Sequence, residues 1–180
     1  CEAVADGAPQ LKARIDSLRA ECQFPTALAS AKELLELRRS DESSKPYHVA
    51  DAERLVSTLE FILSRPVQDQ KELARAYTLY AGWRELLNNS QYDEAKSSAD
   101  EQVEIFTRLL GPDHTDVAIS LQNLGTLYYA LGQYGEAEAP FKRSLAIREK
   151  TLSPDHPDVA RSLNNLAVLY YTQGQYAEAE

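Results

Sequence analysis

The sequence predicts an all-α fold built from stacked pairs of antiparallel helices. Its strongest feature is an internal repeat: residues 111–138 return 42 positions later as residues 153–180, with 19 of the 28 aligned residues identical. Within each copy the apolar residues follow one another by steps of three and four, which is the spacing of one helix face. No segment shows the alternating pattern of a half-buried strand. A period of this length is typical of arrays in which each unit buries its apolar face against the next.

The complete copy of the repeat contains two expected helices. The first, at 115–131, carries its apolar stripe on Val117, Leu121, Leu124, Tyr128 and Leu131. The second, at 134–150, carries its stripe on Ala137, Phe141, Leu145 and Ile147. Gly132 ends the first helix, because glycine readily adopts the left-handed conformation that terminates helices. Small residues at Gly125, Ala137 and Ser144 predict that the two helices approach each other closely.

The N-terminal half predicts further helices whose phase the repeat does not explain. They are expected around residues 11–18, at 24–37, at 46–64 and at 68–87. The helix at 46–64 has no partner at the repeat spacing, so it is either an insertion or part of a divergent capping region. The chain is therefore expected to comprise a divergent N-terminal region at 1–66, a degenerate unit at 67–110, a complete unit at 111–152 and a shortened unit at 153–180.

Nine residues of the complete unit stand at characteristic spacings: Leu121, Leu124, Gly125, Tyr128, Gly132, Tyr134, Ala137, Phe141 and Ser144. This arrangement resembles the tetratricopeptide repeat (TPR) family, and the 42-residue period is similar to the longer variant found in kinesin light chains and many bacterial proteins. A weaker copy precedes it, in which Trp83 replaces Gly125 and argues against tight helix packing at that point. The resemblance implies a right-handed α-solenoid, a TPR-like superhelix whose first helices line a concave groove.

Composition limits the partners that the array can have. The formal net charge is −9 and the isoelectric point is about 4.9, which argues against a nucleic-acid partner because phosphate neutralisation needs clustered Lys and Arg. The acidity is expected mainly to keep the array soluble, although it would also attract cationic peptides at long range. No apolar run approaches the roughly 18 residues of a membrane span, so no transmembrane segment is expected.

No catalytic residue, metal site or cofactor is predicted. His114 and His156 are one repeat apart, so they occupy equivalent loops and cannot converge on one metal ion. A role in the loop or as a helix cap is expected for both. Cys1 and Cys22 lack the spacing of metal ligands and form no disulfide framework. Since no phosphate-binding loop or nucleophile elbow occurs either, we expect a protein that is not an enzyme.

The candidate binding residues share one phase of the successive first helices. On the expected helix at 115–131, Tyr129 is rotated by about 100° from the apolar stripe, towards the face that a superhelical array turns inward. In TPR proteins an asparagine at the place of Asn123 and Asn165 often bonds a bound peptide; the alternative is a hydrogen bond between repeats. Arg84 and Arg161 fall on the same face and could hold a carboxylate. The full candidate site comprises Tyr77, Tyr80, Arg84, Gln122, Asn123, Thr126, Tyr129, Arg161, Asn164, Asn165, Val168 and Tyr171.

These observations favour a protein–protein interaction scaffold that binds a peptide or partner segment in the concave groove of the array. The alternative is a regulatory or spacer array of a larger multidomain protein, such as a signalling ATPase or another enzyme, whose catalytic part lies outside this sequence. The sequence makes no prediction of the oligomeric state.

A cytoplasmic location is favoured, and two interpretations of the first residue remain open. A mature bacterial envelope lipoprotein begins with the cysteine that carries its lipid, and Cys1 is compatible with such an anchor. Alternatively, Cys1 marks a fragment boundary, since the sequence contains no methionine and stops inside an expected helix.

Overall fold

The structure, a computed structural model, describes residues 2–41 and 43–179. These residues form helices joined by short turns, and none of them lies in a β-strand. The helices are α1 (Glu2–Ala20), α2 (Phe24–Ser40), α3 (Pro46–Leu63), α4 (Val67–Asn88), α5 (Tyr92–Leu110), α6 (Thr115–Ala130), α7 (Tyr134–Thr151), α8 (Pro157–Thr172) and α9 (Tyr176–Ala179). They form two compact units, Cys1–Thr78 and Leu79–Glu180, with the boundary inside α4. The all-α fold predicted from the repeat is confirmed.

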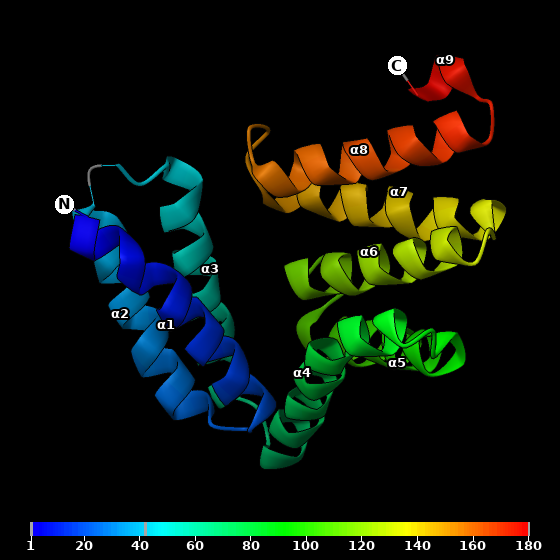
Figure 1. The fold of residues 1–180 in the computed structure, drawn as a ribbon. Helices are drawn as coiled ribbons and strands as arrows, with labels where there is room; N and C mark the ends of the chain where they lie inside the picture. Colours follow the sequence, from blue (N-terminus) through cyan, green and yellow to red (C-terminus); the bar gives the residue numbers. More distant parts are fainter. Residues whose placement is uncertain (1, 42, 180) are drawn as a thin grey trace. The chain divides into compact units, whose positions relative to one another are not determined.

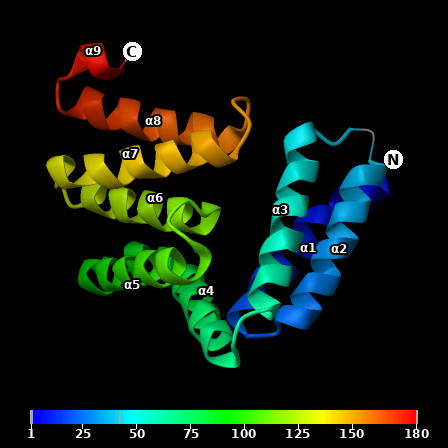
Figure 2. The same cartoon turned by 180° about the vertical axis from the view of Figure 1, so that it is seen from behind.

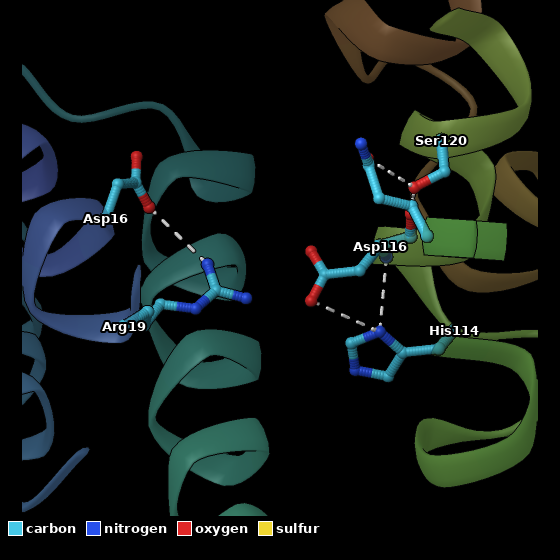
Figure 3. A network of polar contacts seen from close by, with 6 residues as sticks. Asp16, Arg19, His114, Asp116 and Ser120 are labelled. Atoms are coloured by element: carbon cyan, nitrogen blue, oxygen red, sulfur yellow. Dashed lines mark hydrogen bonds and ion pairs between the residues drawn. The ribbon is translucent and has the colours of Figure 1, made fainter. Parts of the chain in front are cut away.

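In the N-terminal unit, α2 packs against both α1 and α3 (Figure 1). Its core includes Ile15, Phe24, Leu59 and Ile62, each of them fully buried. The start of α4 is attached to α1 by polar contacts: the Thr78 hydroxyl donates to the Ala20 carbonyl at 3.1 Å, and the Arg19 guanidinium lies 3.7 Å from the centre of the Tyr77 ring. Arg19 also pairs with Asp16 at 3.4 Å, as the close view in Figure 3 shows. The helix predicted at 46–64 is therefore present and has α2 as its neighbour.

The C-terminal unit contains the stacked repeats. Successive helices from α5 to α8 pack on one another, and both views show α6, α7 and α8 as consecutive layers (Figures 1 and 2). The turns between the paired helices use a left-handed residue at the repeat spacing: Ser90 with a φ of 58°, Gly132 with 71° and Gly174 with 74°. Glycine adopts this conformation without strain. The recurrence of a left-handed residue at the repeat spacing explains why each first helix ends where it does.

The close approach predicted for the complete unit occurs between Gly125 of α6 and Phe141 of α7. A Cβ atom added to Gly125 would lie 2.6 Å from two carbons of the Phe141 ring, so only glycine fits beside this ring. In the preceding unit the large and the small side chain are exchanged. Trp83 stands 42 residues before Gly125, and Ala99 stands 42 residues before Phe141. Trp83 packs on Ala95, Ala99 and Leu127 and is 8% exposed. The expectation of loose packing at Trp83 is therefore wrong, because in this unit the small residue, Ala99, lies on the second helix.

Both repeat histidines cap the helix that follows them. His114 Nδ1 accepts a hydrogen bond from the backbone N–H of Asp116 at 3.1 Å, and His156 Nδ1 accepts one from Asp158 at 3.0 Å. Figure 3 shows His114 beneath Asp116, with Ser120 one turn further along α6. Each bond satisfies one of the free N–H groups at a helix start. The cap role expected from the equivalent loops is confirmed.

We expect His156→Ala to lower the free energy of unfolding by about 1 kcal/mol, the usual cost of losing an N-cap acceptor. His156→Asn should retain most of that stability, because an asparagine side-chain oxygen can accept the same backbone bond. Urea unfolding followed by circular dichroism measures both changes. The His156 ring is 5% exposed. Equal losses for alanine and asparagine would show that packing of the buried imidazole contributes more to stability than the cap hydrogen bond does.

Candidate functional site

The candidate residues of the C-terminal unit occupy one face of α4, α6 and α8, the first helices of their pairs. We call this surface the first-helix face and define it by Tyr80, Arg84, Gln122, Asn123, Thr126, Tyr129, Arg161, Asn164, Asn165, Val168 and Tyr171. Tyr80, Val168 and Tyr171 are 43%, 42% and 67% exposed, which is unusual for side chains of this size. Large exposed side chains at one phase of successive helices indicate a surface that packing within the array does not use.

Tyr77 was placed on this surface by its sequence phase, but it lies in the core of the N-terminal unit. Only 5% of it is exposed, and the Arg19 guanidinium covers its ring. The unit boundary after Thr78 explains the difference, because the phase of the complete repeat does not extend into the first part of α4. Tyr77 is therefore left out of the candidate surface.

Asn123 and Asn165 are equivalent residues of α6 and α8, and both are half-buried. Neither side chain hydrogen-bonds to another residue in the part of the chain that the structure describes, and the Asn123 Nδ2 atom is enclosed without a partner. The alternative role considered for them, a hydrogen bond between repeats, is not observed among these residues. A buried amide without a partner is uncommon and calls for an explanation, since the missing bond costs about 1–3 kcal/mol.

Tyrosine pairs mark the far end of the first-helix face. Tyr129 stands against Tyr134 with ring centres 5.3 Å apart, and the Tyr171 and Tyr176 rings repeat the same separation one unit later. The Tyr129 hydroxyl also lies 3.1 Å from the Thr172 hydroxyl, which joins α6 directly to α8. This contact links the C-terminal ends of α6 and α8, the first helices of successive pairs.

A buried arginine that the sequence interpretation missed stands behind this surface. Arg148, near the end of α7, is 2% exposed. Its Nη1 atom donates to the Gln122 side-chain oxygen, to the Ser162 hydroxyl and, at 3.3 Å, to the Asp158 carbonyl. The arginine follows Phe141 and Ser144 by helical steps on the buried stripe, so a charged residue at an apolar phase was the signal that could have revealed it.

Three first helices supply groups that act on Arg148: Gln122 of α6 through a hydrogen bond, and groups of α4 and α8 through their charge. Burial is the largest influence and lowers the pKa of Arg148 from its usual value. The Asp158 carboxylate acts in the opposite direction, the Arg161 guanidinium again lowers the pKa, and the Tyr80 hydroxyl raises it. The structure thus gathers Tyr80 of α4, Gln122 of α6 and Arg161 of α8 around one buried cation. This grouping was not predicted from the sequence.

The two arginines proposed as carboxylate holders differ in their surroundings. Arg161 pairs with Asp158, with Nη1 and Oδ1 3.0 Å apart, and its side chain is 57% exposed. Arg84 is exposed and makes no ion pair with any residue that the structure describes. Thr126 uses its hydroxyl within α6, donating to the Gln122 carbonyl at 2.9 Å. Asn164 is exposed on α8 beside Asn165.

Within residues 2–41 and 43–179, no three His, Cys, Asp or Glu side chains gather in a way that could hold a metal ion. None of the described helices is both long and apolar enough to cross a membrane.

The sequence matches the model of the tetratricopeptide repeat family over residues 72–150 and 141–180. These matches span more than half of the chain. The chain belongs to the tetratricopeptide repeat family. Such repeats generally mediate protein–protein interaction and are generally non-catalytic scaffolds. A comparison with curated proteins gave no match.

Solved structures of similar TPR proteins agree with the observed fold. BtubC (BKLC) from P. vanneervenii has a TM-score of 0.58 and 22% identity over 98% of this chain and 76% of that chain. A putative kinesin light chain from P. anserina with nearly identical TPR-like repeats has a TM-score of 0.50 and 20% identity over 95% of this chain and 89% of that chain. At these identities the likeness concerns the fold, which resembles the kinesin light chain repeats that the 42-residue period suggested.

Proposed function

We propose that the C-terminal unit is a protein-binding module that holds an extended segment of a partner along the first-helix face. The observation that carries this proposal is the state of Asn123 and Asn165, which lie one repeat apart and make no hydrogen bond to the residues described. An asparagine side chain offers a donor and an acceptor, which is the pattern of one peptide group, and Asn165 can present both. At Asn123, whose Nδ2 atom is enclosed, the side-chain oxygen is the atom left for a partner. Amides at equivalent positions of α6 and α8 suit the backbone of an extended segment.

Exposed side chains on the first-helix face support the same proposal. Tyr80, Val168 and Tyr171 supply contact area there, and the two tyrosines lose little conformational entropy when a partner binds. Gly125 and Phe141 fix the spacing of α6 and α7, so the surface is built on packed helices and needs little ordering when a partner arrives.

A peptide-display selection on the complete chain, using a random dodecamer library, tests this proposal. Selected peptides should bind the unchanged chain and lose at least tenfold in affinity when Val168→Ala and Tyr171→Ala are combined. The matched control is Arg143→Ala combined with Glu149→Ala, which alters two exposed residues of α7 and should leave binding unchanged. The proposal would be abandoned if no peptide bound, or if the α7 variant weakened binding as much as the α8 variant did.

A further inference from the structure

One buried guanidinium joins two successive first helices from behind. Both α6 and α8 pack on α7, and Arg148 of α7 bonds to each of them. Its Nη1 atom donates to the Gln122 side-chain oxygen on α6 and, on α8, to the Ser162 hydroxyl and the Asp158 carbonyl. The same nitrogen therefore fixes both helices that carry the candidate asparagines.

The repeat itself indicates that the fold does not need a charge at this position. Phe106 of α5 stands 42 residues before Arg148, and both side chains are 2% exposed. The preceding unit thus fills the equivalent place with an apolar ring. Burial lowers the pKa of Arg148, so loss of hydration disfavours its charged form. Since apolar residues often replace buried charges without loss of stability, the value of this arginine lies in the direction of its hydrogen bonds.

These hydrogen bonds end beside the two candidate asparagines. Gln122 directly precedes Asn123 on α6, and Ser162 lies three residues, almost one helical turn, before Asn165 on α8. Apolar contacts have no preferred direction and allow one helix to slide or rotate against another. Hydrogen bonds depend strongly on distance and angle, and buried polar groups can specify the register of packed helices.

We infer that Arg148 is a positioning residue of the first-helix face, which holds α6 and α8 in the register at which Asn123 and Asn165 meet the same partner segment. This inference rests on the proposed function. Arg148 does not contact the partner, because it is 2% exposed. A hydrogen bond to a peptide group forms over a range of only about 0.5 Å in length, so a larger shift of α6 against α8 would leave one asparagine unbonded.

Arg148→Phe tests the inference with the residue that the chain itself places at the equivalent position. This variant should still unfold cooperatively, and a dodecamer selected on the unchanged chain should bind it about tenfold more weakly in calorimetry, the effect of about one lost hydrogen bond. Arg148→Lys should recover part of the affinity, because an ammonium group can donate to the same acceptors.

A second comparison asks whether Arg148 acts through the asparagines. When Asn123 and Asn165 are both replaced by alanine, the register of α6 and α8 no longer affects these two contacts. Adding Arg148→Phe to that paired variant should then weaken binding by no more than about twofold, since coupled residues give losses that do not add. A general loss of stability would weaken binding of the paired variant as much as it weakens binding of the unchanged chain.

Ser162→Ala probes the same register without removing the arginine. Ser162 is 2% exposed, so it does not meet a partner, and its replacement removes one of the three Arg148 bonds. We expect a loss of about threefold in affinity, part of the effect of one hydrogen bond. The matched control is Ser120→Ala, the equivalent serine of α6, which is 0% exposed and donates to Gln102 of α5 at 3.2 Å. This control should bind the peptide as the unchanged chain does.

The outcomes separate this inference from the proposed function. Equal affinities of Ser162→Ala and Ser120→Ala for the selected peptides would overturn the inference and leave the proposed function standing, and this comparison decides the matter even if Arg148→Phe does not fold. A further loss of about tenfold on adding Arg148→Phe to the paired asparagine variant would also overturn it, because Arg148 would then act by another route. Failure of every peptide to bind the unchanged chain would remove both proposals.

Discussion

Replacing Phe141 by alanine should lower the free energy of unfolding by about 3–5 kcal/mol, the largest effect that we expect from a single substitution. The Phe141 ring is 4% exposed and packs with Ala137, Leu166 and Leu169, so it joins α7 to both neighbouring first helices. Its removal leaves a cavity that three helices would have to collapse to fill. Urea unfolding followed by the fluorescence of Trp83, the only tryptophan of the chain, measures the loss in the C-terminal unit.

Gly125→Ala tests the same contact from the other side. The new methyl group would lie 2.6 Å from the ring of Phe141, and such overpacking typically costs about 1–3 kcal/mol. Because the two residues touch, the variant carrying both substitutions should lose less stability than the two single losses added together. A neutral Gly125→Ala, or strictly additive losses, would show that this contact does not set the spacing of α6 and α7.

Replacing Asn123 and Asn165 together by alanine should weaken binding of a selected peptide by about 1–3 kcal/mol, because peptide groups buried in the complex would lose their hydrogen bonds. Stability should change much less, since neither asparagine side chain bonds to another described residue in the free protein. Calorimetric titration measures the affinity, and thermal unfolding measures the stability of the same preparation.

The matched control for this pair is Ser97→Ala combined with Lys142→Ala, which alters exposed or partly exposed polar residues of α5 and α7. This variant should bind the peptide normally. Unchanged binding by the asparagine variant, together with a large fall in its melting temperature, would show that the asparagines are structural and that the site is wrongly assigned.

The repeat made most of the C-terminal unit predictable. Local rules were sufficient where one helix pair determines its own packing: the helices expected at 115–131 and 134–150 are observed at Thr115–Ala130 and Tyr134–Thr151, and Gly125 indeed meets a large neighbour. The exchange of sizes between Trp83 and Ala99 was missed, because a comparison of single positions does not register a compensating change on the facing helix.

The candidate surface was predictable only in part, for two physical reasons. Helical phase identifies which side chains share a face, but it does not tell where a unit ends, and Tyr77 was misplaced for that reason. Arg148 was missed because charged residues are almost never fully buried, so an arginine on an apolar stripe is read as a residue at its edge. Its burial depends on Gln122 and Ser162, which belong to two other helices.

The most direct measurement of the central claim is a map of backbone amide shifts in the nuclear magnetic resonance spectrum of the complete chain, recorded as a selected peptide is added. The claim that the first-helix face holds the partner predicts that the largest shifts fall on α6 and α8, around Asn123, Asn165 and Tyr171, with small shifts on the exposed residues of α5 and α7. Shifts concentrated on α5 and α7, with α6 and α8 unchanged, would contradict it.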